Sequence, residues 1–262
     1  MEVSYGSRDM SQPVKYSLPV GSAPLPLNDL AGSSIRIEWK RKINCIHCGR
    51  ETRKSFAQGY CYPCFISLPQ TDACILHPEK CQAHLGVSRD MEWSERNCLQ
   101  DHFVYLALSP GLKVGVTRKS QVPVRWIDQG ASQAIKLALA PNRYIAGTIE
   151  VELKKHLSDK TNWRDMLRGL VSSDIDLREE KTRAASLLPV DLRQYLSGDD
   201  EVFDIAYPVK EYPLKVTTIN LEKNISIEAV LAGIKGQYLI FEGGYVLNIR
   251  KYGGYLVDFY YE

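Results

Sequence analysis

Cysteines and histidines crowd one short part of the chain. Residues 43–102 contain all seven cysteines of the 262-residue sequence and four of its five histidines. The first four cysteines form two Cys-x2-Cys pairs separated by twelve residues, and they are Cys45, Cys48, Cys61 and Cys64. Two such pairs complete the four-sulfur tetrahedral shell that structural zinc prefers. Gly49 and Gly59 permit the tight turns that this shell needs. The spacing therefore predicts a zinc site, with four buried thiols or a redox pair as the alternatives.

The remaining cysteines predict a second zinc site that needs one histidine. They are Cys74, Cys81 and Cys98. His84 follows Cys81 by three residues and is the first choice for the fourth ligand, with His102 and His77 as alternatives. Three buried thiols beside incidental histidines are the competing interpretation. Both sites are expected to have complete protein shells, which favours a structural role over a catalytic one.

Positive charge is concentrated beside the first pair of cysteines. The chain as a whole has 33 Lys+Arg against 31 Asp+Glu, so any affinity for nucleic acid must come from a local patch. Such a patch lies within residues 31–60, whose seven basic residues are Arg36, Lys40, Arg41, Lys42, Arg50, Arg53 and Lys54. Interleaved aromatic residues suit the backbone and bases of DNA or RNA. An ordinary solvated face explains the charges equally well.

The elements that must position these residues divide the chain into five parts. Residues 1–42 form an N-terminal β segment, and 43–102 form a zinc-binding module whose own core is too small to fold without metal. Residues 103–170 alternate short apolar strands with helical stretches and predict an α/β domain. Residues 171–205 form a helical connector, and 206–262 form C-terminal β hairpins that pair with the N-terminal strand. The predicted fold class is α+β.

Several individual elements follow from the patterning. Strands are expected at 35–39, 103–108 and 113–116, and helices at 124–139, 149–157 and 174–188. Two Gly-Gly pairs, Gly243-Gly244 and Gly253-Gly254, lie between runs rich in aromatic and branched residues. Gly-Gly in this setting is a hairpin signal, so three antiparallel strands are expected near 237–242, 245–250 and 255–260.

The segment 103–170 resembles a known nuclease core. Its landmarks, in chain order, are Phe103-Val104-Tyr105, Lys113-Val114-Gly115, Arg118, Arg125, Glu150 and Asn162. This order resembles that of the GIY-YIG nuclease superfamily, in which two short strands precede a helix with an arginine and a helix with a metal-binding glutamate. The whole chain also looks like an uncharacterised bacterial family that joins a cysteine-rich zinc module to such a segment.

The resemblance implies a metal-dependent endonuclease. Glu150 would hold Mg²⁺ or Mn²⁺, with Glu152 as the alternative, and Tyr105 would help to deprotonate the attacking water. Arg125, or alternatively Arg118, would neutralise charge developing on phosphorus, and Asn162 would orient the ends of the site.

Two positions depart from the motifs of the superfamily. Phe103 stands in place of a glycine, and Lys113 stands in place of a tyrosine that positions water. The alternatives to an active endonuclease are a catalytically inactive module that binds nucleic acid and a protein-interaction scaffold.

The sequence gives no sign of a membrane or of secretion. It has no run of about 18 apolar residues, and residues 1–30 lack the apolar core of a signal peptide. We therefore expect a cytoplasmic protein without a membrane partner, in a reducing environment that favours cysteines as metal ligands. The oligomeric state does not follow from the sequence.

Overall fold

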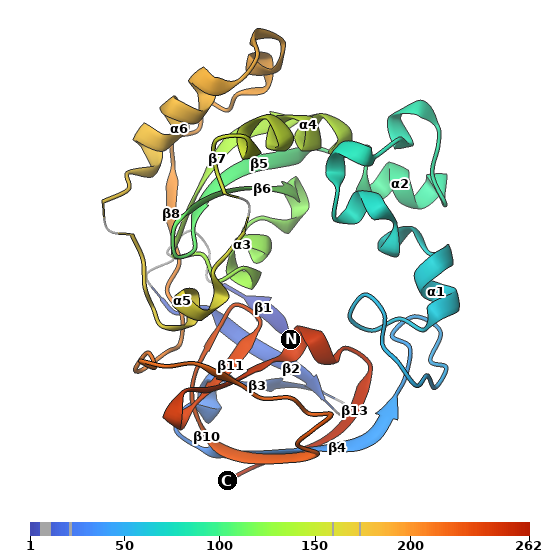
Figure 1. Cartoon of the computed structure of the whole chain (residues 1–262), viewed down its shortest axis with the longest axis vertical. Helices are drawn as coiled ribbons and strands as arrows, with labels where there is room; N and C mark the ends of the chain where they lie inside the picture. The colour runs from blue at the N-terminus through green and yellow to red at the C-terminus, as the bar shows by residue number, and fades with distance from the viewer. Residues whose placement is uncertain (6–11, 21–22, 159, 173) are drawn as a thin grey trace. The chain divides into compact units, whose positions relative to one another are not determined.

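The chain is a mixed α+β protein with three sheets and two compact units. The computed structural model describes residues 1–5, 12–20, 23–158, 160–172 and 174–262 (Figure 1). Unit 1 comprises residues 1–66, 167–169 and 205–262, and unit 2 comprises 67–166 and 170–204. The boundary at 66/67 lies inside the cysteine-rich segment. The first four cysteines therefore belong to unit 1 and the other three to unit 2.

Unit 1 contains two sheets. The smaller sheet has the order β1-β2-β3, built from β1 (Glu2–Ser4), β2 (Lys15–Val20) and β3 (Ala23–Pro26). The larger sheet has the order β13-β4-β10-β11-β12-β9. Its strands are β4 (Ser34–Ile43), β9 (Thr217–Thr218), β10 (Ser226–Lys235), β11 (Tyr238–Phe241), β12 (Tyr245–Asn248) and β13 (Tyr255–Tyr261).

Strand β4 joins the two ends of the chain. Its alternating pattern buries Ile35 and Ile37 and exposes Arg36, as expected for a strand with one face on the core. It pairs antiparallel with β10 on one side and with β13 on the other. The strand extends beyond the predicted 35–39 to Ile43, one residue before the first metal-binding loop begins.

The two Gly-Gly pairs have different roles. Gly243-Gly244 joins the antiparallel pair β11 and β12, as predicted. The prediction is wrong for Gly253-Gly254, because β13 pairs with β4 and not with β12. A Cβ on Gly253 would lie 2.2 Å from the carbonyl oxygen of Gln58, and one on Gly254 would lie 2.2 Å from that of Asn44. These glycines let the backbone pass close to the loops that carry the first four cysteines.

Lys235 is a buried lysine at the end of β10 and gives a testable pH dependence. Its side chain is 3% exposed and lies over the rings of Tyr207 at 5.2 Å and Tyr212 at 4.9 Å. Burial lowers the pKa of Lys235 to about 8. Between this value and the ordinary lysine pKa, the unfolded chain binds the proton and the folded chain does not, so stability rises with pH across that window.

We expect Lys235→Met to remove this rise. The difference in unfolding free energy between the variant and the wild type should favour the variant by about 1–3 kcal/mol at pH 7, after the lost cation–π contacts are allowed for. This difference in unfolding free energy should shrink as pH rises from 8 towards 10. Chemical denaturation of both proteins at pH 7, 8.5 and 9.5 measures the difference. A difference that does not change with pH would contradict the lowered pKa of Lys235.

Unit 2 is built on a four-stranded antiparallel sheet with the order β6-β5-β7-β8. The strands are β5 (His102–Leu108), β6 (Leu112–Arg118), β7 (Gln133–Ala140) and β8 (Val202–Asp204). Figure 1 shows α4 and α3 on opposite sides of these strands. The helices of the chain are α1 (Tyr62–Ser67), α2 (Met91–Asn97), α3 (Val124–Asp128), α4 (Arg143–Lys154), α5 (Trp163–Leu167) and α6 (Leu177–Leu187).

Short 3-10 helices of one or two turns occur throughout the described residues. They lie at Asn28–Leu30, Pro69–Thr71, Ala73–Ile75, Pro78–Lys80, Ala83–Leu85, Lys119–Gln121, Val190–Tyr195, Glu242–Gly244 and Ile249–Tyr252.

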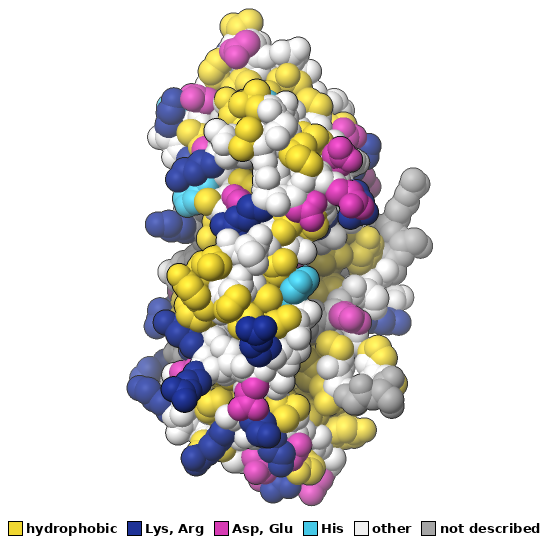
Figure 2. Space-filling view, turned by 90° about the vertical axis from the view of Figure 1, so that its right-hand side faces the viewer, with side chains coloured by type: hydrophobic (Ala, Val, Ile, Leu, Met, Phe, Trp, Pro, Cys, Tyr) yellow, Lys and Arg dark blue, Asp and Glu magenta, His cyan; other side chains and the backbone are white. Residues whose placement is uncertain are grey.

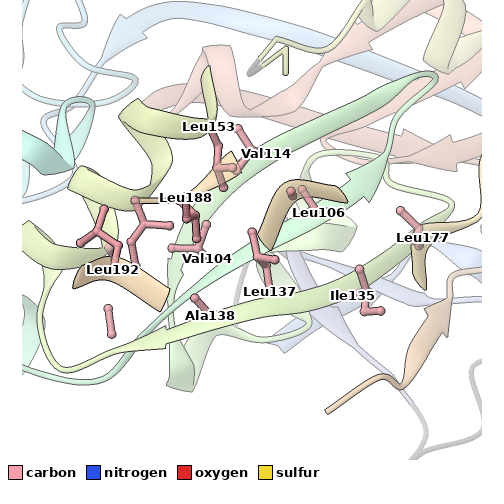
Figure 3. Close-up of a cluster of buried hydrophobic side chains, with 14 of the residues drawn as sticks. Val104, Leu106, Val114, Ile135, Leu137, Ala138, Leu153, Leu177, Leu188 and Leu192 are labelled. Atoms are coloured by element: carbon pink, nitrogen blue, oxygen red, sulfur yellow. The ribbon is translucent and has the colours of Figure 1, made fainter. Parts of the chain in front are cut away.

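The core of unit 2 lies between the sheet and helices α4 and α6. Strand β5 is buried on both faces, and its residues Val104 and Leu106 point into this core (Figure 3). Leu153 of α4 and Leu177 of α6 pack from the other side. The opposite face of β5 carries Tyr105, whose ring lies 5.9 Å from that of Trp126 of α3, centroid to centroid. The strand thereby separates the apolar core from a second, more polar layer.

The predicted helix at 124–139 is wrong beyond its first five residues. Helix α3 ends at Asp128, Gly130 adopts a left-handed conformation at φ 69°, and β7 begins at Gln133. The buried positions of β7 come in adjacent pairs separated by one partly exposed residue. An apolar run of this kind cannot be distinguished from a helix by periodicity, and pairing with β5 determines the outcome.

Candidate functional site

The four cysteines of unit 1 form one compact group. The sulfur atoms of Cys45, Cys48, Cys61 and Cys64 all lie within 4.8 Å of one another, and those of Cys48 and Cys61 are 3.8 Å apart. A tetrahedral ion with metal–sulfur bonds of about 2.3 Å places its ligands about 3.8 Å apart. The sulfur positions therefore fit a zinc ion.

Glycines and backbone amides shape this first group. Gly49 and Gly59 have φ values of 70° and 147°, which other residues rarely adopt. Burial raises the pKa of Cys45, but backbone N–H groups of Cys48, Cys61 and His47 outweigh it and lower the pKa to about 6. Amides directed at a sulfur stabilise the thiolate form, which is the form that binds metal.

The three cysteines of unit 2 form a second group. Their sulfur atoms also lie within 4.8 Å of one another. Hydrogen bonds from Cys74 and Cys81, together with the charge of Arg143, lower the pKa of Cys98. Hydrogen bonds with Cys81 and Cys98, together with burial, raise the pKa of Cys74. The backbone N–H of Arg143 donates to the carbonyl of Cys98 at 2.8 Å, and its side chain contacts the carbonyl of Cys74 at 3.5 Å. Each of the two groups can hold a metal ion such as zinc.

Each predicted histidine lies outside the second group. His84 is exposed and stacks on Tyr144 at a ring-centroid distance of 4.4 Å. His77 is exposed and lies 3.4 Å from Glu79. His102 is 1% exposed, and its Nδ1 lies 2.6 Å from the carbonyl oxygen of Gln100. Among the described residues, no imidazole joins the three sulfurs within 4.8 Å.

A close backbone contact fixes the second group to helix α4. A Cβ on Gly147 would lie 2.2 Å from the backbone nitrogen of Glu79, within the loop between Cys74 and Cys81. Only glycine allows this approach. Helix α4 also carries Glu150, so the cysteine-rich segment helps to position that carboxylate.

Several landmarks of the α/β segment gather around Tyr105. This residue is 0% exposed, and its hydroxyl donates to Oε1 of Gln129 at 3.0 Å. Lys113, which is 3% exposed, donates to the same Gln129 oxygen and to Oγ1 of Thr161, the latter at 2.9 Å. Gln129 and Thr161 were not predicted, because no spacing or motif distinguishes a single amide or hydroxyl.

The charged groups near Tyr105 are Arg125 and Glu150. Burial raises the pKa of Tyr105 to about 12, with the Arg125 guanidinium opposing this shift and the Glu150 carboxylate adding to it. The phenol therefore keeps its proton at neutral pH and acts as a donor.

The alternative arginines and glutamates lie in different surroundings. Arg125 lies beside Tyr105, whereas Arg118 donates to the side chain of Asn97 next to the three-cysteine segment. Glu150 is 7% exposed and lies 3.2 Å from Lys154. Glu152 pairs with Lys155 at 2.5 Å.

Asn162 is placed differently from the other landmarks. It is exposed, and its side chain donates to Asp165 at 2.6 Å, at the start of α5. Its neighbour Thr161, not Asn162 itself, contacts Lys113.

Gly115 provides the space for the Tyr105 ring and gives a second prediction. The two residues are cross-strand partners, and a Cβ on Gly115 would lie 2.6 Å from the Tyr105 hydroxyl. We expect Gly115→Ala to displace the ring and to lower the unfolding free energy by about 1–3 kcal/mol. Gly111→Ala is the matched control, because a Cβ there meets nothing within 4 Å. Equal stability of the two variants in urea denaturation would contradict this packing.

The fold and the two cysteine groups define a mixed α+β protein that can hold metal ions such as zinc. The family model described as "Protein of unknown function (DUF2797)" matches residues 32–257, and the chain belongs to this family. No curated protein and no solved structure matches the chain. Within the described residues, every helix is too short or too polar to cross a bilayer.

Proposed function

We propose that unit 2 is a divalent-metal-dependent endonuclease that hydrolyses phosphodiester bonds in DNA or RNA. The observation that carries this proposal is the gathering of Lys113, Arg125 and Glu150 around the buried Tyr105. These four residues come from β5, β6, α3 and α4. The order of these elements along the chain also follows the order expected from the resemblance to the GIY-YIG superfamily.

The donor set fits a hard divalent ion that also binds substrate. Glu150 is a largely buried carboxylate, and Mg²⁺ or Mn²⁺ commonly uses one or two carboxylates together with substrate phosphate oxygens. Such an ion would polarise the phosphate and stabilise the leaving oxygen. Glu150 would hold it, with Lys154 steadying the carboxylate from 3.2 Å.

The remaining residues would act directly on the phosphate. The Arg125 guanidinium neutralises charge that builds on the phosphoryl oxygens, and Lys113 supplies a second positive charge held in place by Gln129 and Thr161. Tyr105 keeps its proton, which it donates to Gln129, and its hydroxyl oxygen can accept a hydrogen bond from the attacking water. Lys113 thus replaces the second motif's tyrosine with a cation.

The proposal is tested with zinc-loaded full-length protein and a panel of labelled single-stranded and duplex DNA and RNA. We expect cleavage that requires added Mg²⁺ or Mn²⁺ and leaves the zinc content unchanged. A chain that cuts none of these substrates above the metal-free background would overturn the proposal.

A second function, binding of nucleic acid by the basic surface of unit 1, is favoured by a separate observation. All seven basic residues within 31–60 are exposed. Three are held by neighbours, since Lys40 pairs with Asp258, Arg36 stacks over Tyr260 at 4.3 Å and Lys54 lies over the ring of Phe56 at 5.2 Å. Figure 2 shows a face on which Lys and Arg side chains gather in the lower part, with acidic and hydrophobic side chains between them.

This binding function predicts a salt-dependent affinity that depends on Arg41 and Lys42. We expect the double variant Arg41→Gln/Lys42→Gln to weaken binding of a labelled oligonucleotide and to reduce the slope of log K against log salt by about one to two. Lys223→Gln, an exposed lysine elsewhere in unit 1, is the control. An unchanged slope in the double variant would exclude this surface.

A further inference from the structure

The three-cysteine group of unit 2 opens onto a cavity. A cavity of about 290 Å³ is lined by Cys74, Cys81 and Cys98 together with residues of the surrounding loops. At about 30 Å³ per water molecule, it has room for on the order of ten waters, far more than one ion occupies. A metal ion held by the three sulfurs would therefore have space beside it for a ligand.

Among the described residues, no further His, Cys, Asp or Glu joins the three sulfurs within 4.8 Å. The residues that line the cavity include no histidine, and His77 and His84 are exposed and engaged elsewhere. Arg143, which does not line the cavity, lies against Cys98 and the carbonyl of Cys74. Because the three cysteines line the cavity, a ligand in the cavity could reach a metal ion that they hold.

The cavity walls combine apolar and polar groups. Trp93, Ala83 and Val87 supply apolar surface, and Lys80 and Arg89 supply positive charge. Arg89 is held by Asp72 at 3.0 Å, and Asp72 in turn accepts a hydrogen bond from the backbone of Cys74 at 3.1 Å. A small, partly apolar molecule suits these walls.

The donor set determines the kind of atom that completes the shell. Three thiolates select a soft metal such as zinc, and such an ion favours a further soft donor. A thiol that coordinates a metal loses its proton. We propose that the three cysteines hold a metal ion whose fourth position binds the sulfur of a small exogenous thiol in this cavity. The S–H bond breaks, the sulfur lone pair forms the metal–sulfur bond, a water ligand leaves, and the proton passes to solvent.

This inference rests on metal binding at the second group and is independent of the nuclease proposal. Cadmium-113 NMR of cadmium-loaded full-length protein, kept reduced with a phosphine, tests it. We expect two resonances, one from each group. Addition of 2-mercaptoethanol should move one of them towards the all-sulfur position of the other, while ethylene glycol moves neither. The four-cysteine resonance is the internal reference.

Two variants assign the responding resonance. Cys81→Ser should abolish or shift it while the other stays in place. Val87→Trp alters an exposed residue of the cavity wall, leaves the sulfurs intact and should weaken the response to 2-mercaptoethanol several-fold.

Three results would overturn the proposal. In the first, neither resonance responds to the thiol. In the second, both resonances move or disappear together. In the third, His102→Ala shifts the second resonance before any thiol is added, which would show that a histidine of the chain already completes the shell.

Discussion

Replacement of Cys61 by serine is expected to release the metal from the four-cysteine group and to unfold the loops around it. Cys61 is buried, and its sulfur lies 3.8 Å from that of Cys48. The loops have little regular structure of their own, with isolated bridges at Asn44–Glu51 and Phe56–Tyr60. Structural zinc contributes on the order of 10 kcal/mol to such small modules, so its loss should lower the melting temperature by about 10 °C or more.

Zinc analysis and thermal unfolding measure this effect together. The wild type should carry two zinc ions per chain, one for each cysteine group, and Cys61→Ser should carry one. His47→Ser is the matched control, because His47 is an exposed neighbour whose contribution to Cys45 comes from its backbone N–H. Two zinc ions and an unchanged melting temperature in Cys61→Ser would contradict the assignment.

Replacement of Glu150 by glutamine is expected to have the largest effect on catalysis. The side chain is 7% exposed, and glutamine preserves its volume while removing the charge that would hold the divalent ion. By comparison with the loss of a single electrostatic group in other enzymes, we expect kcat/KM for nucleic-acid cleavage to fall on the order of 10²- to 10³-fold. The measurement is single-turnover cleavage at saturating Mg²⁺.

Glu152→Gln is the control for this variant. It lies two residues away on the same helix, and its carboxylate pairs with Lys155 at 2.5 Å. We expect its activity to stay within a few-fold of the wild type, because loss of an exposed ion pair costs less than about 1 kcal/mol. Equal losses of activity in the two variants would indicate a general effect of charge on α4 and would count against a specific role for Glu150.

The cysteine spacing predicted the four-sulfur group because its geometry is set locally. Two Cys-x2-Cys turns with Gly49 and Gly59 nearby determine the sulfur positions almost without help from the rest of the chain. The fourth ligand of the second group was harder to predict. The single turn Ala83–Leu85, ended by Gly86 at φ 75°, directs His84 towards Tyr144 instead of the sulfurs.

The candidate site in the α/β segment depends on register, which the sequence does not show directly. The order of landmarks could not distinguish Arg118 from Arg125. Arg118 ends β6 opposite His102, where it reaches Asn97, while Arg125 lies on α3 next to Tyr105. The loop that returns from α4 brings Thr161 to Lys113, a contact between residues far apart in sequence. Such contacts follow from tertiary packing and leave no local pattern.

Binding of a divalent ion by Glu150, beside Tyr105 and Arg125, is tested most directly by electron paramagnetic resonance of Mn²⁺. Both cysteine groups are filled with zinc, and a non-cleavable phosphodiester oligonucleotide is present. We predict one bound Mn²⁺ per wild-type chain and a loss of this binding in Glu150→Gln, with Glu152→Gln like the wild type. Equal Mn²⁺ binding by the wild type and Glu150→Gln would contradict binding of the ion by Glu150.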